Sequence, residues 1–223
     1  MNVSSLYRPA SPLARTLRIH VIVLDLCIFL SLNALAFDSE LQPEEVREAY
    51  SLGQTSNHEE LKEFLSKYKY DLPYPADNPV VDVQSVEFQT PYEQIVLRSM
   101  RNSYSKFQAD EDYQANPGLL IVRVQISLKL NYVGPIPPAD GFKVSVSQAE
   151  PIAPRKTAST LLCNPSPYGE QAMGSDCTIN LIYLREILLS FNARQFAPGV
   201  ASVKVKTPDG QTIQTKFNLD ELK

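Results

Sequence analysis

Histidine, cysteine and glycine are scarce in this sequence, and tryptophan is absent. The 223 residues include two histidines, three cysteines and eight glycines. Structural zinc sites take four ligands, mainly cysteine and histidine, and phosphate-binding loops need clustered glycines. The glycines are scattered here, and neither a G-x-G-x-x-G motif nor a P-loop occurs. We therefore expect no metal site and no cofactor.

The shortage of histidine also limits nucleophilic catalysis. His58 is the single histidine after residue 36, so a Ser-His-Asp or Cys-His arrangement there would have to use it. It stands beside Glu59 and Glu60 at the start of a predicted helix, and the sequence has no G-x-S-x-G motif. We interpret His58 as an exposed polar residue and assign no catalytic residue.

The N-terminal segment predicts export. Three arginines and no acidic residue precede an apolar run over 19–32, and Ala34 and Ala36 match the small-x-small site of signal peptidase. These features predict a signal peptide over 1–36, with Phe37 as the first mature residue. A retained anchor is the alternative, but the run contains an aspartate and is shorter than the ~20 residues that span a bilayer. We expect a periplasmic or secreted protein with no stable membrane span after cleavage.

Acidic residues outnumber basic ones along the chain. The formal net charge is −4, and cleavage after Ala36 would make it more negative because three arginines and one aspartate would be lost. Binding of nucleic acid rewards clustered lysine and arginine, and no such cluster stands out. We therefore expect no nucleic-acid partner.

Residues 37–72 are predicted to form a helical hairpin. Pro43 suits the first turn of one helix, and Gly53 suits its C-terminal end. In the second helix, apolar residues follow the i, i+3, i+4, i+7 spacing of one face: Leu61, Phe64, Leu65 and Tyr68. This stripe either packs on the chain's own sheet, which is the commoner use of such a face, or contacts a protein partner in the envelope.

A proline-rich segment over 73–79 is predicted to link the hairpin to the remainder, 80–223. There VVDVQSVEF is a strand candidate, and a helix is predicted over about 91–105. Thr90 and Glu93 have capping-box spacing, and Pro91 suits the first helical turn. The acidic segment ADEDYQANPG fails the EF-hand pattern and is expected to be a solvated loop.

Alternation of apolar and polar residues predicts several strands. The clearest run is GLLIVRVQISLKLNY; FKVSVS, a segment ending at Leu162 and a hairpin around Thr207-Pro208-Asp209-Gly210 follow. TINLIYLREILLSF is interpreted as extended at first and then as a short helix over 184–191. The predicted class is mainly β with helices (α+β): an antiparallel, immunoglobulin-like β-sandwich over 80–223 with one inserted helix, preceded by the helical hairpin.

Cys163 and Cys177 flank a stretch rich in turn-forming residues, NPSPYGEQAMGSD. An even number of cysteines in an oxidising compartment favours pairing, and this spacing is far from C-x-x-C. We predict a disulfide between them, which would contribute roughly 3 kcal/mol by restricting the unfolded chain.

Three segments, EAYSLGQ, TPYEQIVLRS and VKTPDGQTIQTKFNLDEL, resemble parts of uncharacterised exported proteins of environmental bacteria. The resemblance spans most of the chain after residue 36. It implies export, and it carries over no named family, no activity and no functional residue.

The sequence favours a non-enzymatic exported protein that binds or supports a partner in the cell envelope. The alternative is a hydrolase of envelope or extracellular polymers, acting through a pair of carboxyls that sequence spacing does not reveal. A third option is a carrier with an apolar cavity between sheet and helices.

Overall fold

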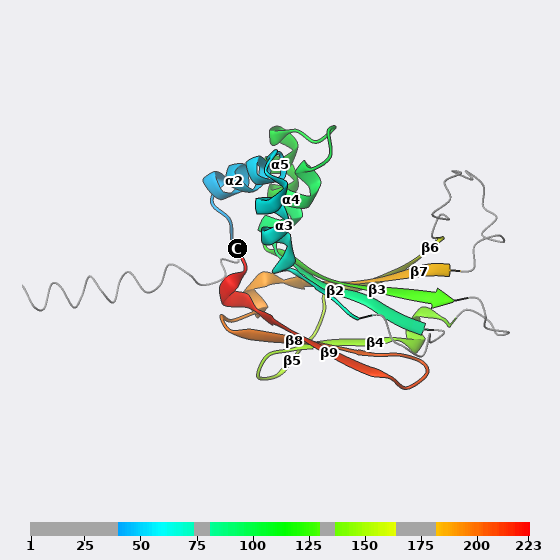
Figure 1. Cartoon of the computed structure of the whole chain (residues 1–223). Coiled ribbons are helices and arrows are strands. Elements are labelled where there is room, and N and C mark those ends of the chain that lie inside the picture. The colour runs from blue at the N-terminus through cyan, green and yellow to red at the C-terminus, as the bar shows by residue number, and fades with distance from the viewer. Residues whose placement is uncertain (1–39, 74–80, 130–136, 164–181) are drawn as a thin grey trace, which may run out of the picture. The chain divides into compact units, whose positions relative to one another are not determined.

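The computed structural model describes residues 40–73, 81–129, 137–163 and 182–223, all within one compact unit from Phe37 to Lys223. These residues form four α-helices and two open antiparallel sheets, which confirms the α+β class. Figure 1 shows the helices gathered over one end of the larger sheet and the smaller sheet on its other face. Every described helix is too short or too polar to cross a bilayer.

Two helices occupy the segment predicted as a helical hairpin, but the first of them packs mainly against two later helices of the chain. α2 (Pro43–Gly53) begins with a capping box in which the main-chain N–H of Gln42 donates to Glu45 Oε2 at 2.7 Å. α3 (His58–Ser66) begins after Asn57, whose Oδ1 accepts a hydrogen bond from the Glu60 N–H at 3.3 Å. Such caps satisfy N–H groups that have no partner inside a helix.

Two further helices replace the single helix predicted over about 91–105. α4 (Pro91–Ser99) starts as expected, with Thr90 Oγ1 accepting from the Glu93 N–H at 3.2 Å, but it ends at Ser99. α5 (Lys106–Ala115) occupies most of the segment expected to be an acidic loop. Its start is a reciprocal capping box between Ser105 and Gln108, a local signal that outweighs the acidic composition.

The larger sheet has five strands in the order β1-β2-β3-β7-β6. Their bounds are β1 (Lys69–Asp71), β2 (Val81–Gln89), β3 (Leu119–Lys129), β6 (Lys156–Cys163) and β7 (Ile182–Asn192). β3 pairs with β7 along its whole length. Its alternation is as predicted, because Val122 and Val124 are buried on the core face while Arg123 lies on the opposite, outer face.

The short helix predicted over 184–191 is wrong, because these residues belong to the strand β7. Residues on its core face, such as Ile187 and Leu189, are buried, and Leu184 and Leu188 on its outer face are half-buried. A central strand with apolar residues on both faces has no clear period of two, so its sequence resembles a buried helix.

The smaller sheet has four strands in the order β5-β4-β8-β9. Their bounds are β4 (Lys143–Ser147), β5 (Pro151–Ile152), β8 (Val200–Lys206) and β9 (Thr212–Asn218). The predicted turn joins β8 to β9, and Gly210 has a φ of 92°, a conformation that glycine adopts without strain. Short 3-10 turns cover Ala139–Gly141, Ala193–Gln195 and Leu219–Glu221.

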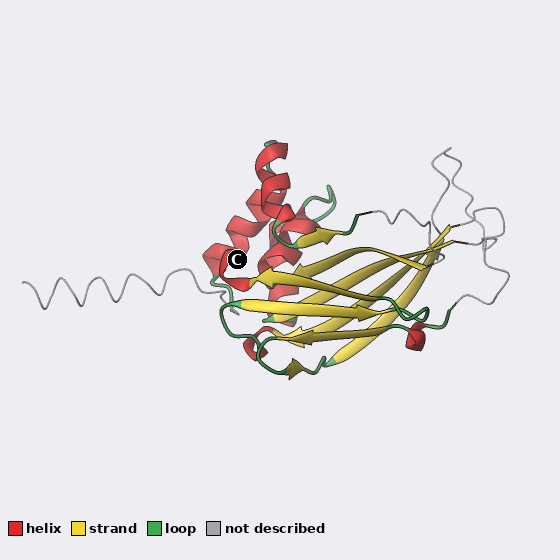
Figure 2. Cartoon of the chain, turned by 60° about the horizontal axis from the view of Figure 1, so that its bottom comes forward, coloured by secondary structure: helices red, strands yellow, loops and turns green. Residues whose placement is uncertain are grey.

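The apolar faces of the two sheets contribute to one buried cluster, and Figure 2 shows the sheets lying face to face. Phe88 of β2 is central to this cluster, with its ring centroid 5.4 Å from that of Phe196 and 5.5 Å from that of Phe217 on β9. A second cluster lies between the helices and includes Val46, Leu61 and Val96. The half-buried ring of Phe64 packs against both clusters.

Candidate functional site: a groove between α4 and the larger sheet

Polar side chains form a ladder across the outer face of the larger sheet, beside α4. Arg123 of β3 lies between two carboxylates, with Nη1 3.3 Å from Glu87 Oε2 on β2 and Nε 2.6 Å from Glu186 Oε1 on β7. Gln89 Nε2 donates to Glu87 Oε2 at 2.8 Å, which holds that carboxylate from a second side. Burial alone would lower the pKa of Arg123, but Glu186 and then Glu87 outweigh it and raise the pKa. The ladder is therefore a fixed network of charges.

Glu93, the third residue of α4, lies close to this ladder and is only 1% exposed. Within the described part of the chain, neither of its carboxyl oxygens has a hydrogen-bond partner. Burial raises the pKa of Glu93 well above the usual value; the charge of Glu87 raises it further, and Arg123 opposes the shift. Glu93 therefore holds its proton at a pH at which an exposed glutamate would be ionised.

A groove of about 460 Å³ opens beside the ladder, between α4 and the outer face of the sheet. From α4 and the residues that follow it, the groove is lined by Leu97, Arg98, Met100 and Arg101. The sheet contributes Ile121, Arg123, Glu186 and Leu188. Both walls thus combine apolar and charged groups.

The three arginines of the groove differ in how their charges are balanced. Arg98 Nη1 lies 2.7 Å from Asp112 Oδ2 on α5, and Arg123 is held by its two carboxylates. Arg101 is exposed and has no ion-pair partner among the described residues. The groove therefore presents one uncompensated positive charge to a ligand.

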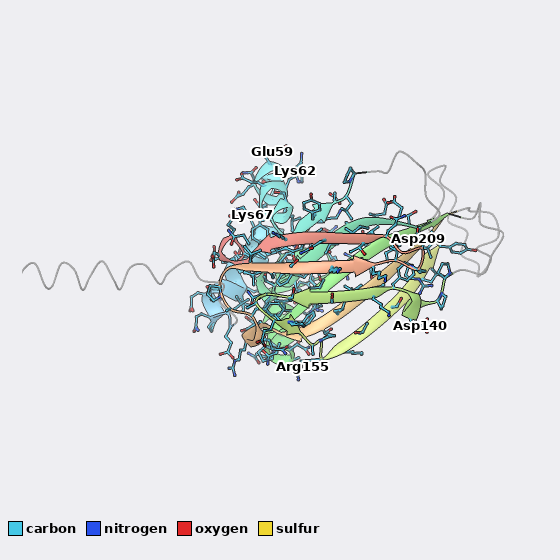
Figure 3. The ribbon with its side chains drawn as sticks, turned by 90° about the horizontal axis from the view of Figure 1, so that it is seen from below. Glu59, Lys62, Lys67, Asp140, Arg155 and Asp209 are labelled. Carbon is cyan, nitrogen blue, oxygen red and sulfur yellow. The ribbon has the colours of Figure 1, made fainter. Side chains whose placement is uncertain are left out.

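The sequence-predicted stripe on α3 faces inward. Leu61 and Tyr68 are buried, and Phe64 and Leu65 are half-buried and pack against the core clusters. Leu61 and Leu65 pack in the cluster between the helices, whereas Tyr68, which follows α3, packs in the sheet cluster, so only part of the stripe packs on the chain's own sheet. Figure 3 shows the other face of the helix, where Glu59 and Lys62 point outward; the neighbouring His58 is also exposed.

Other predicted site residues fall outside the described residues. Ala34, Ala36 and Phe37, which define the cleavage site, lie in the segment 1–39. Cys163 ends β6, but its predicted partner Cys177 lies in the segment 164–181. The linker predicted over 73–79 also falls almost wholly in a segment that is not described.

Sequence reasoning missed the groove and the ladder beside it. Glu93 was interpreted as a capping-box carboxylate, yet its side chain is buried instead of reaching back to Thr90.

No group of three or more histidine, cysteine, aspartate or glutamate side chains suited to a metal ion occurs in the described ranges. Comparisons with protein-family profiles, curated proteins and solved structures find no match to this chain.

Proposed function

We propose that this chain is an exported, non-enzymatic binding protein of the cell envelope, and that the groove beside α4 holds an extended acidic segment of a partner protein. The observation that carries the proposal is Arg101, an exposed and unpaired guanidinium among the described residues, in a groove with apolar walls. A guanidinium favours a carboxylate because its N–H groups match the two oxygens.

The apolar lining sets the second requirement for the ligand. Met100 is 46% exposed, and Leu97, Ile121 and Leu188 are half-buried, so all four keep surface that a ligand could cover. Methionine adapts to ligands of irregular shape because it is unbranched and polarizable. A peptide in which apolar residues flank a glutamate or aspartate satisfies the apolar walls and Arg101 together.

Amide groups of the groove suit a peptide main chain. Gln94 Nε2 donates to the main-chain oxygens of Leu119, at 2.7 Å, and of Gln89, at 3.3 Å, which orients its Oε1 as an acceptor. Gln89 likewise uses its amide nitrogen on Glu87. Both residues line the groove, where such acceptors would receive N–H groups of an extended ligand.

Hydrolysis by a carboxyl pair finds less support in this groove. Such a mechanism needs two carboxyl groups that face the substrate from both sides. Glu186 is the single carboxylate in the lining, and Arg123 holds it at 2.6 Å. Glu93 has the raised pKa of a general acid, but it is buried away from the lining. Binding is therefore the activity that we propose.

Two further parts of the proposal concern architecture and location. The shared core and the face-to-face sheets support a β-sandwich of immunoglobulin-like architecture. Export, to the periplasm or beyond the cell, rests on the basic N-terminus, the apolar run and the Ala-Leu-Ala site.

The groove can be tested with short synthetic peptides in which leucine alternates with glutamate, serine or lysine. Fluorescence anisotropy should show that the glutamate series binds most tightly and weakens as salt rises. Arg101→Glu should raise the dissociation constant for the glutamate series about ten-fold, because it replaces attraction by repulsion. Lys62→Glu is the matched control, since it makes the same change of charge on the outward face of α3. Equal effects of the two variants, or no binding by any series, would refute the proposal.

A further inference from the structure

After its first residue, Lys156, the edge strand β6 carries none of the usual protections of an edge strand. β6 ends the larger sheet, and no described strand pairs with its outer edge. It runs for eight residues, and from Thr157 to Cys163 it contains no charge, proline or glycine. Every side chain from Lys156 to Leu161 is exposed, on both faces of the sheet. Unpaired N–H and C=O groups on such an edge recruit another strand, which is why most soluble proteins guard their edges.

The other edges of the described sheets are better guarded. β1 has three residues, and Lys69 and Asp71 form an ion pair along it at 2.7 Å. β5 has two residues and begins with Pro151. β9 is longer, but it carries Lys216 on an exposed position. Short length, charge and proline are three of the common devices against edge pairing. The contrast marks β6 as an edge built to be paired.

We propose that β6 pairs antiparallel with β6 of a second copy of this chain, joining two larger sheets into one continuous sheet. Lys156 is the only charged residue of the strand and stands at its end. Antiparallel pairing centred near Ser159 places the two lysines at opposite ends, about 20 Å apart at about 3.4 Å per residue. The strand is therefore complementary to itself, as a twofold interface requires.

The smaller sheet leaves room for the second copy. On the core side of β6, Thr157, Ser159 and Leu161 stay exposed, and Leu161 is 39% exposed. The smaller sheet ends in the two-residue strand β5, so it does not cover β6. Figure 3 shows Arg155, which directly precedes β6, at the margin of the molecule beyond β4. Across the twofold axis, Leu161 of each copy would meet a side chain of the partner strand on this face.

Pairing in this way has a consequence for binding. A twofold axis perpendicular to the sheet keeps the outer faces of both copies on the same side. The two grooves would then face the same way, so a dimer could hold two sites of one partner with greater avidity than a monomer. The dimer itself does not depend on what the groove binds.

The test is the oligomeric state of the full chain, measured by sedimentation velocity over a concentration series. We expect a reversible dimer. Thr160→Lys should raise its dissociation constant about ten-fold or more, because the two lysines would lie opposite or diagonal to each other across the new pair. Thr160 is exposed and lies across from Glu186 within the chain, so a lysine there has a partner in the monomer.

Two controls make the outcome decisive. Thr212→Lys makes the same change on the exposed edge strand β9 and should leave the dimer intact. High salt should restore association of Thr160→Lys, since the Debye length falls from about 30 Å at 0.01 M to about 3 Å at 1 M, and misfolding would not respond in this way. A wild-type monomer at every concentration overturns the proposal, as does a Thr160→Lys variant that associates like the wild type. Binding of an added peptide to β6 in a protein that stays monomeric would also refute self-pairing.

Discussion

At Glu93, the helix dipole favours the charged form of the carboxyl group, whereas burial favours the neutral form. The third residue of a helix is a favourable place for a carboxylate, because the N-terminal end of the helix dipole is positive. At this residue, however, burial is nearly complete and no described group donates a hydrogen bond to the carboxyl oxygens. The cost of ionising a carboxyl group without partners exceeds the dipole's contribution of about 0.3–1 kcal/mol, so the neutral form is favoured.

The protonation of Glu93 makes stability depend on pH. The unfolded chain releases this proton near the ordinary value of 4.5, whereas the raised pKa retains it in the folded state. Between those two pKa values the folded state binds more protons, so the free energy of unfolding falls by about 1.4 kcal/mol for each pH unit of rise. Glu93→Gln removes the titration, and its stability relative to wild type should increase from acidic to alkaline pH.

Urea unfolding of both proteins across this pH range checks the prediction. The glutamine also buries an amide, but that cost is the same at every pH, so the slope of the difference is the informative quantity. Glu59→Gln, on the outward face of α3, serves as the control, because it makes the same substitution at an exposed position. Parallel pH profiles for wild type and Glu93→Gln would contradict a protonated Glu93.

At the scale of elements, α2 and α4 approach each other at Gly53. The sequence predicted that the helix ends at Gly53, and α2 does end at this residue, which is buried. A Cβ atom added at this position would overlap the main-chain oxygen of Val96 and Ser99 Oγ. A main-chain atom cannot move aside as the end of a flexible side chain can. The missing side chain is therefore what lets the two helices pack closely.

Gly53→Ala should destabilise the protein by about 1–3 kcal/mol, the usual effect of overpacking. Helix propensity alone predicts the opposite sign, since alanine is favoured over glycine by about 1 kcal/mol inside a helix. Denaturant unfolding distinguishes the two effects. Ser51→Ala, an exposed position of the same helix, should change stability by less than about 0.5 kcal/mol. An unchanged or stabilised Gly53→Ala variant would show that α2 can shift away from α4.

Local signals in the sequence predicted several of the elements. Thr90 and Pro91 placed the start of α4, and the alternation around Arg123 placed β3. Prediction failed where two signals competed. Leu184 and Leu188 make the outer face of β7 apolar as well, so the alternation typical of a strand is lost. At α5, the acidic composition indicated a loop, whereas the capping box at Ser105 indicated a helix start.

The groove could not be predicted in the same way, because tertiary structure assembles it. Glu87 and Arg123 are separated by 36 residues and Arg123 and Glu186 by 63, and only the register of β2, β3 and β7 brings them together. Glu93 carries a correct local signal for a cap, yet the docking of α4 on the sheet decides its burial. Exposure, which distinguishes Arg101 from Arg98, likewise depends on where α5 packs.

At the scale of the whole molecule, Phe64 packs against both the helix cluster and the sheet cluster. The ring centroid of Phe64 lies 4.8 Å from that of Tyr68, in the sheet cluster, and 5.7 Å from that of Tyr92, in the helix cluster. Lys223 adds polar links, since its main-chain oxygen accepts from Thr90 Oγ1 at 2.6 Å and its Nζ lies 2.7 Å from Glu48 on α2. Because the groove lies between α4 and the larger sheet, its shape depends on these contacts, which hold the helix cluster against the sheet cluster.

Removal of the Phe64 ring should destabilise the helices more than the sheets. Phe64→Ala is expected to cost about 2–3 kcal/mol, less than for a fully buried phenylalanine, because the ring is half-buried. Native-state hydrogen exchange should show amides of α2 to α5 losing more protection than those of β3 and β7, since the sheet keeps its own core without the helices. Phe107→Ala makes the same change at a residue that is 69% exposed and should leave both layers unaffected. If Phe64→Ala lowered protection equally in both layers, the helices and sheets would unfold as one unit, and the groove between them would be as stable as the core itself.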